Sequence, residues 1–122
     1  MRKYSKEHQW ALVEGDKVFV GITNYAAEQL GDVVFVEMPA VGDQLAANDQ
    51  MAVVESVKTS SDVYAPVSGE VLEINEAVVD EPEKLNAEPE GKDWMVVLTL
   101  RNPEELNDLM SKDEYLEFIN GE

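Results

Sequence analysis

Short β-rich runs, each closed within a few residues by glycine, proline, asparagine or aspartate, recur along most of this 122-residue chain. Runs of roughly 4–8 residues between such turn signals are typical of β-strands. They cover residues 10–13, 17–22, 32–38, 51–57, 62–65, 70–74 and 94–100. Strands this short and this closely spaced favour a sandwich or a barrel. We therefore predict a mostly β fold.

Helices are predicted at three places outside these runs. Residues 23–30 form a short helix with Thr23 or Asn24 as its N-cap, and Gly31 ends it. Two more short helices follow residue 101, because Asn102-Pro103-Glu104-Glu105 supplies an N-cap, a proline at N1 and a glutamate at N3, and Ser111-Lys112-Asp113-Glu114 repeats the capping-box pattern. Residues 77–93 are predicted to be a long surface loop with at most one helical turn.

The length of the chain predicts a single domain over residues 1–122, with a core at about residues 8–101 and a C-terminal helical segment at about residues 102–120. The N-terminal residues are charged and lead into no apolar core of a signal peptide, and no run approaches the roughly 18 apolar residues of a membrane helix. We therefore expect a cytoplasmic protein of bacterial type, without a targeting segment and without a membrane partner.

Composition excludes several classes of function. The chain has no cysteine and one histidine, His8, which removes disulfides, a cysteine nucleophile, most zinc sites and any dyad that needs two imidazoles. We expect no catalytic residues and no metal site. The net charge of -17 repels nucleic acid and anionic membranes and favours a monomer. Such acidity either keeps the protein soluble or steers it toward basic protein partners.

One lysine stands alone in this acidic chain. The basic residues nearest to Lys58 in the sequence are Lys17 and Lys84, and residues 18–83 hold 13 acids around this single cation. Lys58 follows the run at 51–57, and the hydroxyl residues after it suit a tight turn. A lysine at a hairpin tip extends a flexible stem and a nucleophilic amine into water, which suits acylation by another enzyme. Charge and position alone favour a solubilising lysine, or one that relieves repulsion among its acidic neighbours, over a modification site, because most exposed lysines have no specific role.

The residues around Lys58 resemble the biotinyl/lipoyl carrier pattern of strand, lysine turn, strand and Pro/Gly corner. The pattern runs through Val53-Val54-Glu55-Ser56-Val57-Lys58 and then Val63-Tyr64-Ala65-Pro66-Val67-Ser68-Gly69-Glu70-Val71. Biotin carriers usually have methionine on both sides of the lysine, whereas valine and threonine flank it here. The sequence more specifically resembles the H proteins of the glycine cleavage system. That resemblance extends along nearly the whole chain through His8-Gln9-Trp10, residues 21–26, residues 30–37, Asn75-Glu76 and residues 103–106.

The resemblance implies a fold and a function. The fold would be a barrel-sandwich hybrid of two antiparallel sheets with short peripheral and C-terminal helices. Lipoate would be the cofactor, joined as an amide to Lys58 by a lipoylating enzyme. The protein would be a non-catalytic carrier that shuttles the aminomethyl group from glycine decarboxylase to the aminomethyltransferase and electrons to dihydrolipoamide dehydrogenase. The alternatives are an H-like relay of lipoyl groups, a biotin carrier, or an acidic binding module that carries no group.

Three supporting residues are predicted beside Lys58. Glu55 either screens the amine or helps the lipoylating enzyme to recognise it, or is a solvated carboxylate at a strand edge. Ser56 belongs to the same matched motif. Asp62, four residues after Lys58, is the candidate for holding a cationic loaded arm, or else only begins the return strand.

The sequence departs from the family at three positions. Gln9 stands where H proteins usually have glutamate after the histidine, which removes a negative charge that a loaded arm would face. Glu90 and Asp93 stand where tyrosine and glycine are usual, so the loop around them is expected to differ locally. We interpret His8 as a residue at a strand entry, packed by Trp10, rather than as a catalytic group.

We also assign the aromatic side chains of Trp10, Phe35 and Trp94 to the core.

Overall fold

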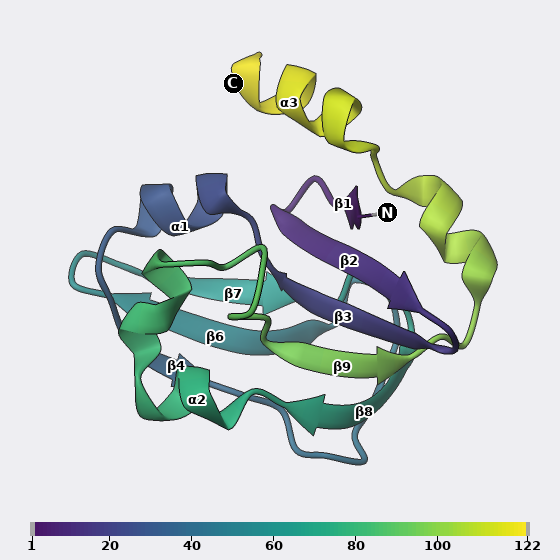
Figure 1. The fold of residues 1–122 in the computed structure, drawn as a ribbon, viewed down its shortest axis with the longest axis horizontal. Coiled ribbons are helices and arrows are strands. Elements are labelled where there is room, and N and C mark those ends of the chain that lie inside the picture. Colours follow the sequence, from purple (N-terminus) through teal and green to yellow (C-terminus); the bar gives the residue numbers. More distant parts are fainter. Residues whose placement is uncertain (1, 122) are drawn as a thin grey trace.

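A computed structural model describes residues 2–121, which fold into nine strands in two antiparallel sheets (Figure 1). The six-stranded sheet has the order β1-β2-β3-β9-β8-β5, and the three-stranded sheet has the order β4-β6-β7. The strands are β1 (Arg2–Tyr4), β2 (Gln9–Glu14), β3 (Lys17–Ile22), β4 (Val33–Glu37), β5 (Gln44–Leu45), β6 (Gln50–Ser56), β7 (Ser60–Tyr64), β8 (Gly69–Ile74) and β9 (Val96–Thr99). The predicted mostly β, barrel-sandwich architecture is confirmed. The strands β1 and β5 were not predicted.

The larger sheet is built on the predicted hairpin of β2 and β3, which turns at Gly15 with a φ of 67°. Trp10 on β2 lies opposite Gly21 on β3, and a Cβ atom added at Gly21 would stand 2.8 Å from the indole nitrogen of Trp10. Only glycine leaves room for the indole at this position. The indole N–H donates to the carbonyl oxygen of Pro89 at 2.7 Å, which joins this sheet to the loop before β9.

The core lies between the two sheets and is made mainly of valine. Val20 and Val96 from the larger sheet and Val36 and Val54 from the smaller one are fully or almost fully buried in the same apolar cluster. β-Branched residues pack well on pleated surfaces, which is why the valine-rich runs could be recognised as strands.

Phe35 is not a core residue, contrary to the prediction. A β-bulge between Val33 and Phe35 interrupts the pairing of β4 with β6, and the Phe35 side chain is 49% exposed. Val33 and Val36, on either side, are the buried residues of β4. A bulge shifts the alternation of faces along a strand, so the prediction from simple alternation failed here. Trp10 is buried as predicted, and Trp94 is partly buried.

The first helix, α1 (Asn24–Leu30), confirms the prediction. The Thr23 side chain is its N-cap and accepts from the Ala26 N–H at 3.1 Å, and Gly31 ends it with a φ of 77°. Ala27 and Leu30 are its buried residues. The helix ends immediately before β4, beside the β6–β7 hairpin (Figure 1).

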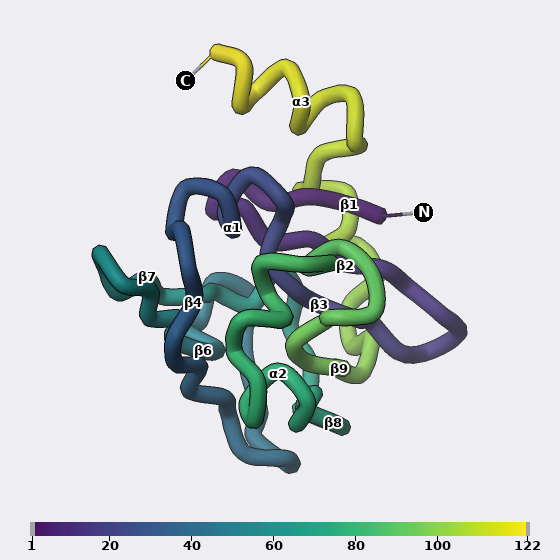
Figure 2. The backbone as a smooth tube through the Cα atoms, turned by 60° about the vertical axis from the view of Figure 1, so that its left-hand side comes forward, coloured from purple at the N-terminus to yellow at the C-terminus, as the bar shows by residue number. Residues whose placement is uncertain are grey.

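The predicted loop at residues 77–93 is more ordered than expected. It contains α2 (Glu76–Asp80) and the 3₁₀ helix η1 (Pro82–Asn86), in which Val78 and Leu85 are completely buried. This segment, green in Figure 2, contacts both α1 and β4. Two buried anchors among acidic, exposed neighbours gave too weak a periodic pattern to predict these helices.

Both C-terminal helices are present, as the 3₁₀ helix η2 (Pro103–Asp108) and α3 (Lys112–Asn120). Ser111 and Glu114 form the predicted capping box of α3. Glu105, predicted to complete a capping box in η2, instead accepts from the Ser68 N–H at 2.7 Å and from the Ser68 hydroxyl at 2.6 Å. None of the helices within residues 2–121 is both long and apolar enough to cross a membrane.

Candidate functional site at the Lys58 hairpin

Lys58 lies at the tip of the hairpin formed by β6 and β7, as predicted, and its side chain is exposed. The turn is tighter than predicted, because Ser60 and Ser61 already belong to β7. Two paired strands of the smaller sheet therefore fix the backbone on both sides of the lysine, while its side chain stays exposed to solvent.

The buried hydroxyl of Ser56 holds the tip together. It accepts from the N–H groups of Lys58 at 3.3 Å and Thr59 at 3.1 Å, and it donates to the carbonyl oxygen of Thr59 at 3.2 Å. A serine hydroxyl has one proton and two lone pairs, so these three contacts use its full capacity. Ser56 therefore organises the turn that presents Lys58.

The α1–β4 connection supports the hairpin from one side. The Val57 N–H donates to the carbonyl oxygen of Asp32 at 3.0 Å, and the Lys58 stem passes over Gly31. A Cβ atom added at Gly31 would lie 3.4 Å from Cε and 4.0 Å from Nζ of Lys58. Glycine at this position both permits the positive φ and leaves room for the lysine stem.

Asn86, at the end of η1, is a supporting residue that the sequence analysis missed. Its side-chain oxygen accepts from the Val33 N–H at 2.9 Å, and its side-chain nitrogen donates to the carbonyl oxygen of Gly31 at 2.8 Å. It therefore spans the connection on which the Lys58 stem rests. An asparagine within an acidic stretch that looked like a loop gave no signal of this long-range contact.

Glu55 and Asp62 are both exposed residues of the hairpin strands. Glu55 pairs with Ser60 across the hairpin and with Phe35 on the other side. Asp62 lies within β7, opposite Val53, and accepts from the Gln50 side-chain nitrogen at 3.1 Å. Among residues 2–121, no carboxylate forms an ion pair with the Lys58 amine. Neither supporting carboxylate therefore binds the lysine, and both remain on the surface beside it.

His8 and Gln9 have structural contacts. The His8 Nδ1 is 2.8 Å from the Tyr115 hydroxyl, and its ring packs against Tyr25 and the side chains of α3. The interpretation of His8 as a residue at a strand entry is confirmed, since β2 begins at Gln9. The His8 ring packs against Tyr25 and α3, whereas Trp10 was the predicted neighbour. The buried Gln9 amide accepts from the Ser5 hydroxyl at 2.7 Å and donates to the Glu7 carbonyl at 2.8 Å.

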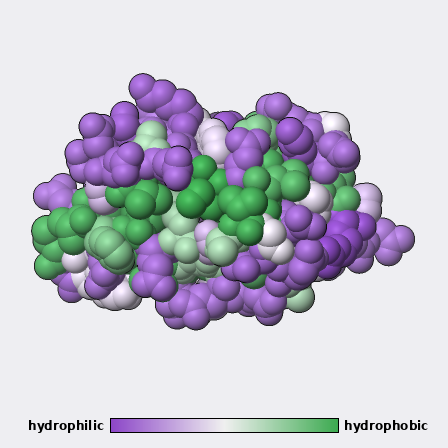
Figure 3. Space-filling model, turned by 90° about the horizontal axis from the view of Figure 1, so that it is seen from below, coloured by the Kyte–Doolittle hydropathy of each residue, from purple (hydrophilic) through white to green (hydrophobic). Residues whose placement is uncertain are grey.

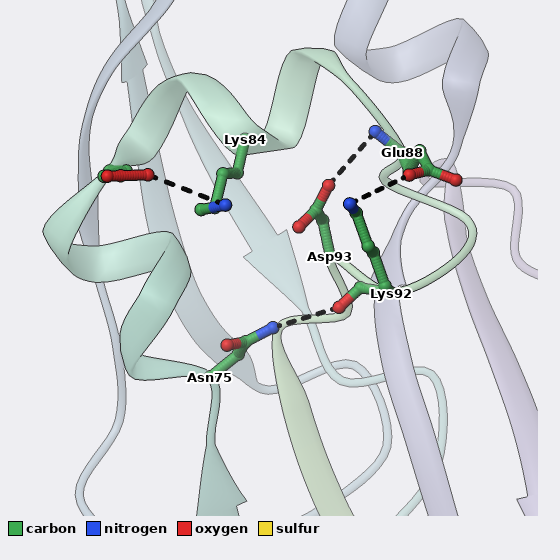
Figure 4. Close-up of polar contacts among 6 residues, drawn as sticks. Asn75, Lys84, Glu88, Lys92 and Asp93 are labelled. Carbon is green, nitrogen blue, oxygen red and sulfur yellow. Dashed lines mark hydrogen bonds and ion pairs between the residues drawn. The ribbon is translucent and has the colours of Figure 1, made fainter.

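Of the other two departures, Glu90 ties its loop to the body, and Asp93 closes the loop on itself. One oxygen of Glu90 accepts from the Asn24 N–H at 2.7 Å and the other accepts from the Tyr4 hydroxyl at 3.2 Å. The buried Asp93 carboxylate accepts from the Glu88 N–H at 3.2 Å, as Figure 4 shows.

The loop also has side-chain contacts to its own lysine and to the end of β8. Lys92 forms an ion pair with Glu88 at 3.4 Å, and the Asn75 amide donates to the Lys92 carbonyl at 3.3 Å (Figure 4). The same amide donates to the carbonyl oxygen of Trp94 at 2.8 Å, so the two ends of the segment between β8 and β9 are joined to each other.

Comparisons with known proteins agree along nearly the whole chain. The family model described as glycine cleavage H-protein matches residues 2–122. The glycine cleavage system H protein of Halalkalibacterium halodurans is 52% identical over 120 residues, which cover 98% of this chain and 94% of that protein. The H protein of Phenylobacterium zucineum is 54% identical over 117 residues, which cover 96% of this chain and 97% of that protein.

A solved structure supports the same assignment. The crystal structure of the glycine cleavage system H protein from Mycobacterium marinum superposes with a TM-score of 0.85 and 37% sequence identity, covering 99% of this chain and 97% of that one. On the family match, the identities and the fold, this chain belongs to the glycine cleavage H-protein family and is a non-catalytic carrier subunit of the glycine cleavage system.

Proposed function

We propose that this protein carries a lipoyl group in amide linkage on Lys58 and presents that arm in turn to the other components of the glycine cleavage system. The observation that carries the proposal is the position of Lys58, an exposed lysine at the tip of a hairpin whose turn Ser56 holds through three hydrogen bonds. Because no ion pair within residues 2–121 engages its amine, modification breaks no contact that the fold needs.

The attachment is an acyl transfer from lipoyl adenylate, a mixed anhydride of lipoate and AMP, to the Lys58 amine. The amine, after losing a proton to solvent, attacks the acyl carbon. The new C–N bond forms, the acyl C–O bond breaks, and the nucleotide leaves as AMP. When bound, lipoate supplies a dithiolane, the sulfur chemistry that a chain without cysteine lacks.

The protein itself contributes a rigid base and electrostatics. The paired strands and Ser56 fix the attachment point, so only the stem of Lys58 and the arm beyond it are mobile. A tether of this kind raises the local concentration of its end at each docked partner. Amide formation also removes the one cation of residues 18–83, so that every charged side chain left in that stretch is negative.

We propose distinct roles for the three supporting residues. Ser56 shapes the turn. Glu55, exposed three residues before Lys58, contributes to recognition by the lipoylating enzyme. Asp62, already fixed by Gln50, provides negative charge for a cationic loaded arm. The buried Gln9 side chain is a neutral amide bonded to Ser5 and Glu7, and it therefore provides no charge for a loaded arm.

We propose glycine decarboxylase, the aminomethyltransferase and dihydrolipoamide dehydrogenase as the partners that use the arm. The aminomethyl group would pass from the first to the second, and the third would take up the electrons. The net charge of -17 supports docking to basic surfaces on these partners.

Intact-mass measurement tests the attachment directly. The protein is incubated with lipoate, ATP and a bacterial lipoate-protein ligase, and we expect a single lipoyl-sized increment that is absent in Lys58→Arg. Lys84→Arg is the matched control and retains the increment. An unmodified wild-type protein, or an increment that survives in Lys58→Arg, refutes the proposal. Glycine-dependent exchange of carbon dioxide with a bacterial glycine decarboxylase then tests the cycle, and the lipoylated protein must support it.

A further inference from the structure

Three large apolar side chains are exposed beside Lys58, and we refer to Val34, Phe35 and Val57 together as the apolar patch. Their exposed fractions are 54%, 49% and 70%. Single exposed apolar residues are ordinary on protein surfaces, but a group of them indicates an interaction site. Seen from below, apolar side chains form a band that begins at the left end of the molecule, where Figure 1 places the β6–β7 hairpin, and continues across its middle (Figure 3).

Strand pairing brings the patch together and turns it outward. Phe35 pairs with Glu55, and Val57 follows Glu55 by two residues, so Phe35 and Val57 emerge on the same face as that carboxylate. The bulge at Val34 exposes a second side chain of β4 on the surface. Bulges are features that re-aim side chains, and this one exposes apolar area next to the modified hairpin.

The surroundings of the patch are acidic. Glu55 lies opposite Phe35, Glu37 is two residues beyond it on β4, and the carbonyl oxygen of Asp32 accepts the Val57 N–H. Both glutamates are exposed. A complementary surface would therefore present an apolar contact with lysine or arginine around it. A second copy of this chain fits poorly, since each copy has a net charge of -17.

The reach of the lysine decides which partner the patch serves. An enzyme that acylates the Lys58 amine must bring its active site to the end of an unmodified lysine stem, and therefore must contact the residues beside the hairpin tip. Enzymes that act on the far end of a lipoyl arm can dock farther away. We infer that the apolar patch is the docking surface for the lipoylating enzyme, an inference that rests on the proposed modification of Lys58.

The test compares the lipoylation kinetics of full-length unmodified variants. Val34→Thr/Phe35→Thr removes the apolar contact while keeping residues that favour strands, and both positions are distant from Lys58 in the chain. With lipoate, ATP and a bacterial lipoate-protein ligase, we expect the KM for the carrier to rise at least tenfold and kcat to stay within twofold. Val41→Thr, at a 63% exposed position in the β4–β5 connection, is the matched control, and its KM should stay within twofold of wild type.

The possible failures can be told apart. If wild type accepts no lipoyl group, the proposed function fails and the docking surface with it. If wild type is modified at Lys58 but the double variant keeps the wild-type KM, or Val41→Thr raises the KM equally, only the docking inference is wrong. Sedimentation velocity covers the remaining case, since a wild-type dimer that the double variant converts to monomer would assign the patch to self-association. Circular dichroism and thermal unfolding confirm that the variants are folded.

Discussion

The Ser56 hydroxyl fixes the turn that presents Lys58. It is buried, and it makes all of its possible hydrogen bonds to the backbone of the turn. Removing it leaves the N–H groups of Lys58 and Thr59 without their protein acceptor, which is costly compared with removing an exposed hydroxyl.

We therefore predict that Ser56→Ala lowers the free energy of unfolding by about 1–3 kcal/mol and slows lipoylation of Lys58, because the turn no longer holds one conformation. Urea denaturation and the rate of the mass increment measure the two effects. Ser60→Ala, at an exposed position of the same hairpin, is the control and should leave both within experimental error. Equal effects from the two serines would contradict the assigned role of Ser56.

Gly31 carries a second residue-scale prediction. Its φ of 77° disfavours any side chain, and a Cβ atom there would also touch the Lys58 stem at 3.4 Å. Gly31→Ala should cost about 1–3 kcal/mol of stability, because a φ of 77° with a ψ of -154° lies in a backbone region that essentially only glycine adopts. Gly121→Ala, at a φ of -83°, is the matched control and should cost much less. Thermal and urea unfolding measure the stability of both variants, and an equal loss in the two would contradict the prediction.

At the scale of elements, the ends of helices could be predicted from the sequence because short-range capping contacts determine them. The Thr23 cap and Gly31 predicted α1, and Ser111 with Glu114 predicted the start of α3. These signals act within one turn of chain and need no knowledge of the fold. By contrast, the bulge that exposes Phe35 depends on how β4 pairs with β6, so its sequence gave no sign of it.

Glu105 illustrates how a tertiary contact overrides a local pattern. A glutamate at N3 of a helix can cap that helix, but this carboxylate is instead bound to the backbone and hydroxyl of Ser68. The contact fastens η2 to the corner before β8, 37 residues earlier in the chain. Helix capping explains why a glutamate is favoured at position 105. Its actual partner, Ser68, can be seen only in the folded structure.

We predict that Glu105→Gln lowers stability by about 1–2 kcal/mol, because an amide replaces a charged acceptor that receives two short hydrogen bonds. Glu104→Gln is the control, since its side chain is exposed and the substitution removes the same charge. Denaturant unfolding at equal ionic strength should separate the two variants. If both lose the same stability, loss of net charge rather than the Ser68 contact is responsible.

At the scale of the whole molecule, the two ends of the chain close on each other. Tyr4 in β1 exchanges backbone hydrogen bonds with Met110 at 2.8 and 2.7 Å, and its ring stacks on Tyr115 with centroids 4.9 Å apart. Capping patterns predicted the C-terminal helices, and the β-rich runs predicted the hairpin at Lys58, but no pattern in the sequence predicted β1 or this closure. Pairing between residues more than a hundred positions apart has no local signature.

The closure should make stability depend on alkaline pH through Tyr4. Burial, and then the nearby negative charge of Glu90, whose carboxylate accepts a hydrogen bond from the Tyr4 hydroxyl, raise the pKa of Tyr4 from 10.0 to about 12. The folded state thus binds this proton more tightly than the unfolded state does. The resulting contribution to stability is complete below about pH 10 and is lost as the pH rises from about 10 to about 12.

We predict that the unfolding free energy of wild type falls more steeply across this window than that of Tyr4→Phe, which has no proton to lose at this position. Urea unfolding at intervals from about pH 9 to about pH 12 measures both slopes. Tyr64→Phe, in the other sheet, keeps Tyr4 and should retain the wild-type slope. Parallel curves for wild type and Tyr4→Phe would show that the contact between Tyr4 and Glu90 does not couple the closure of the chain ends to pH.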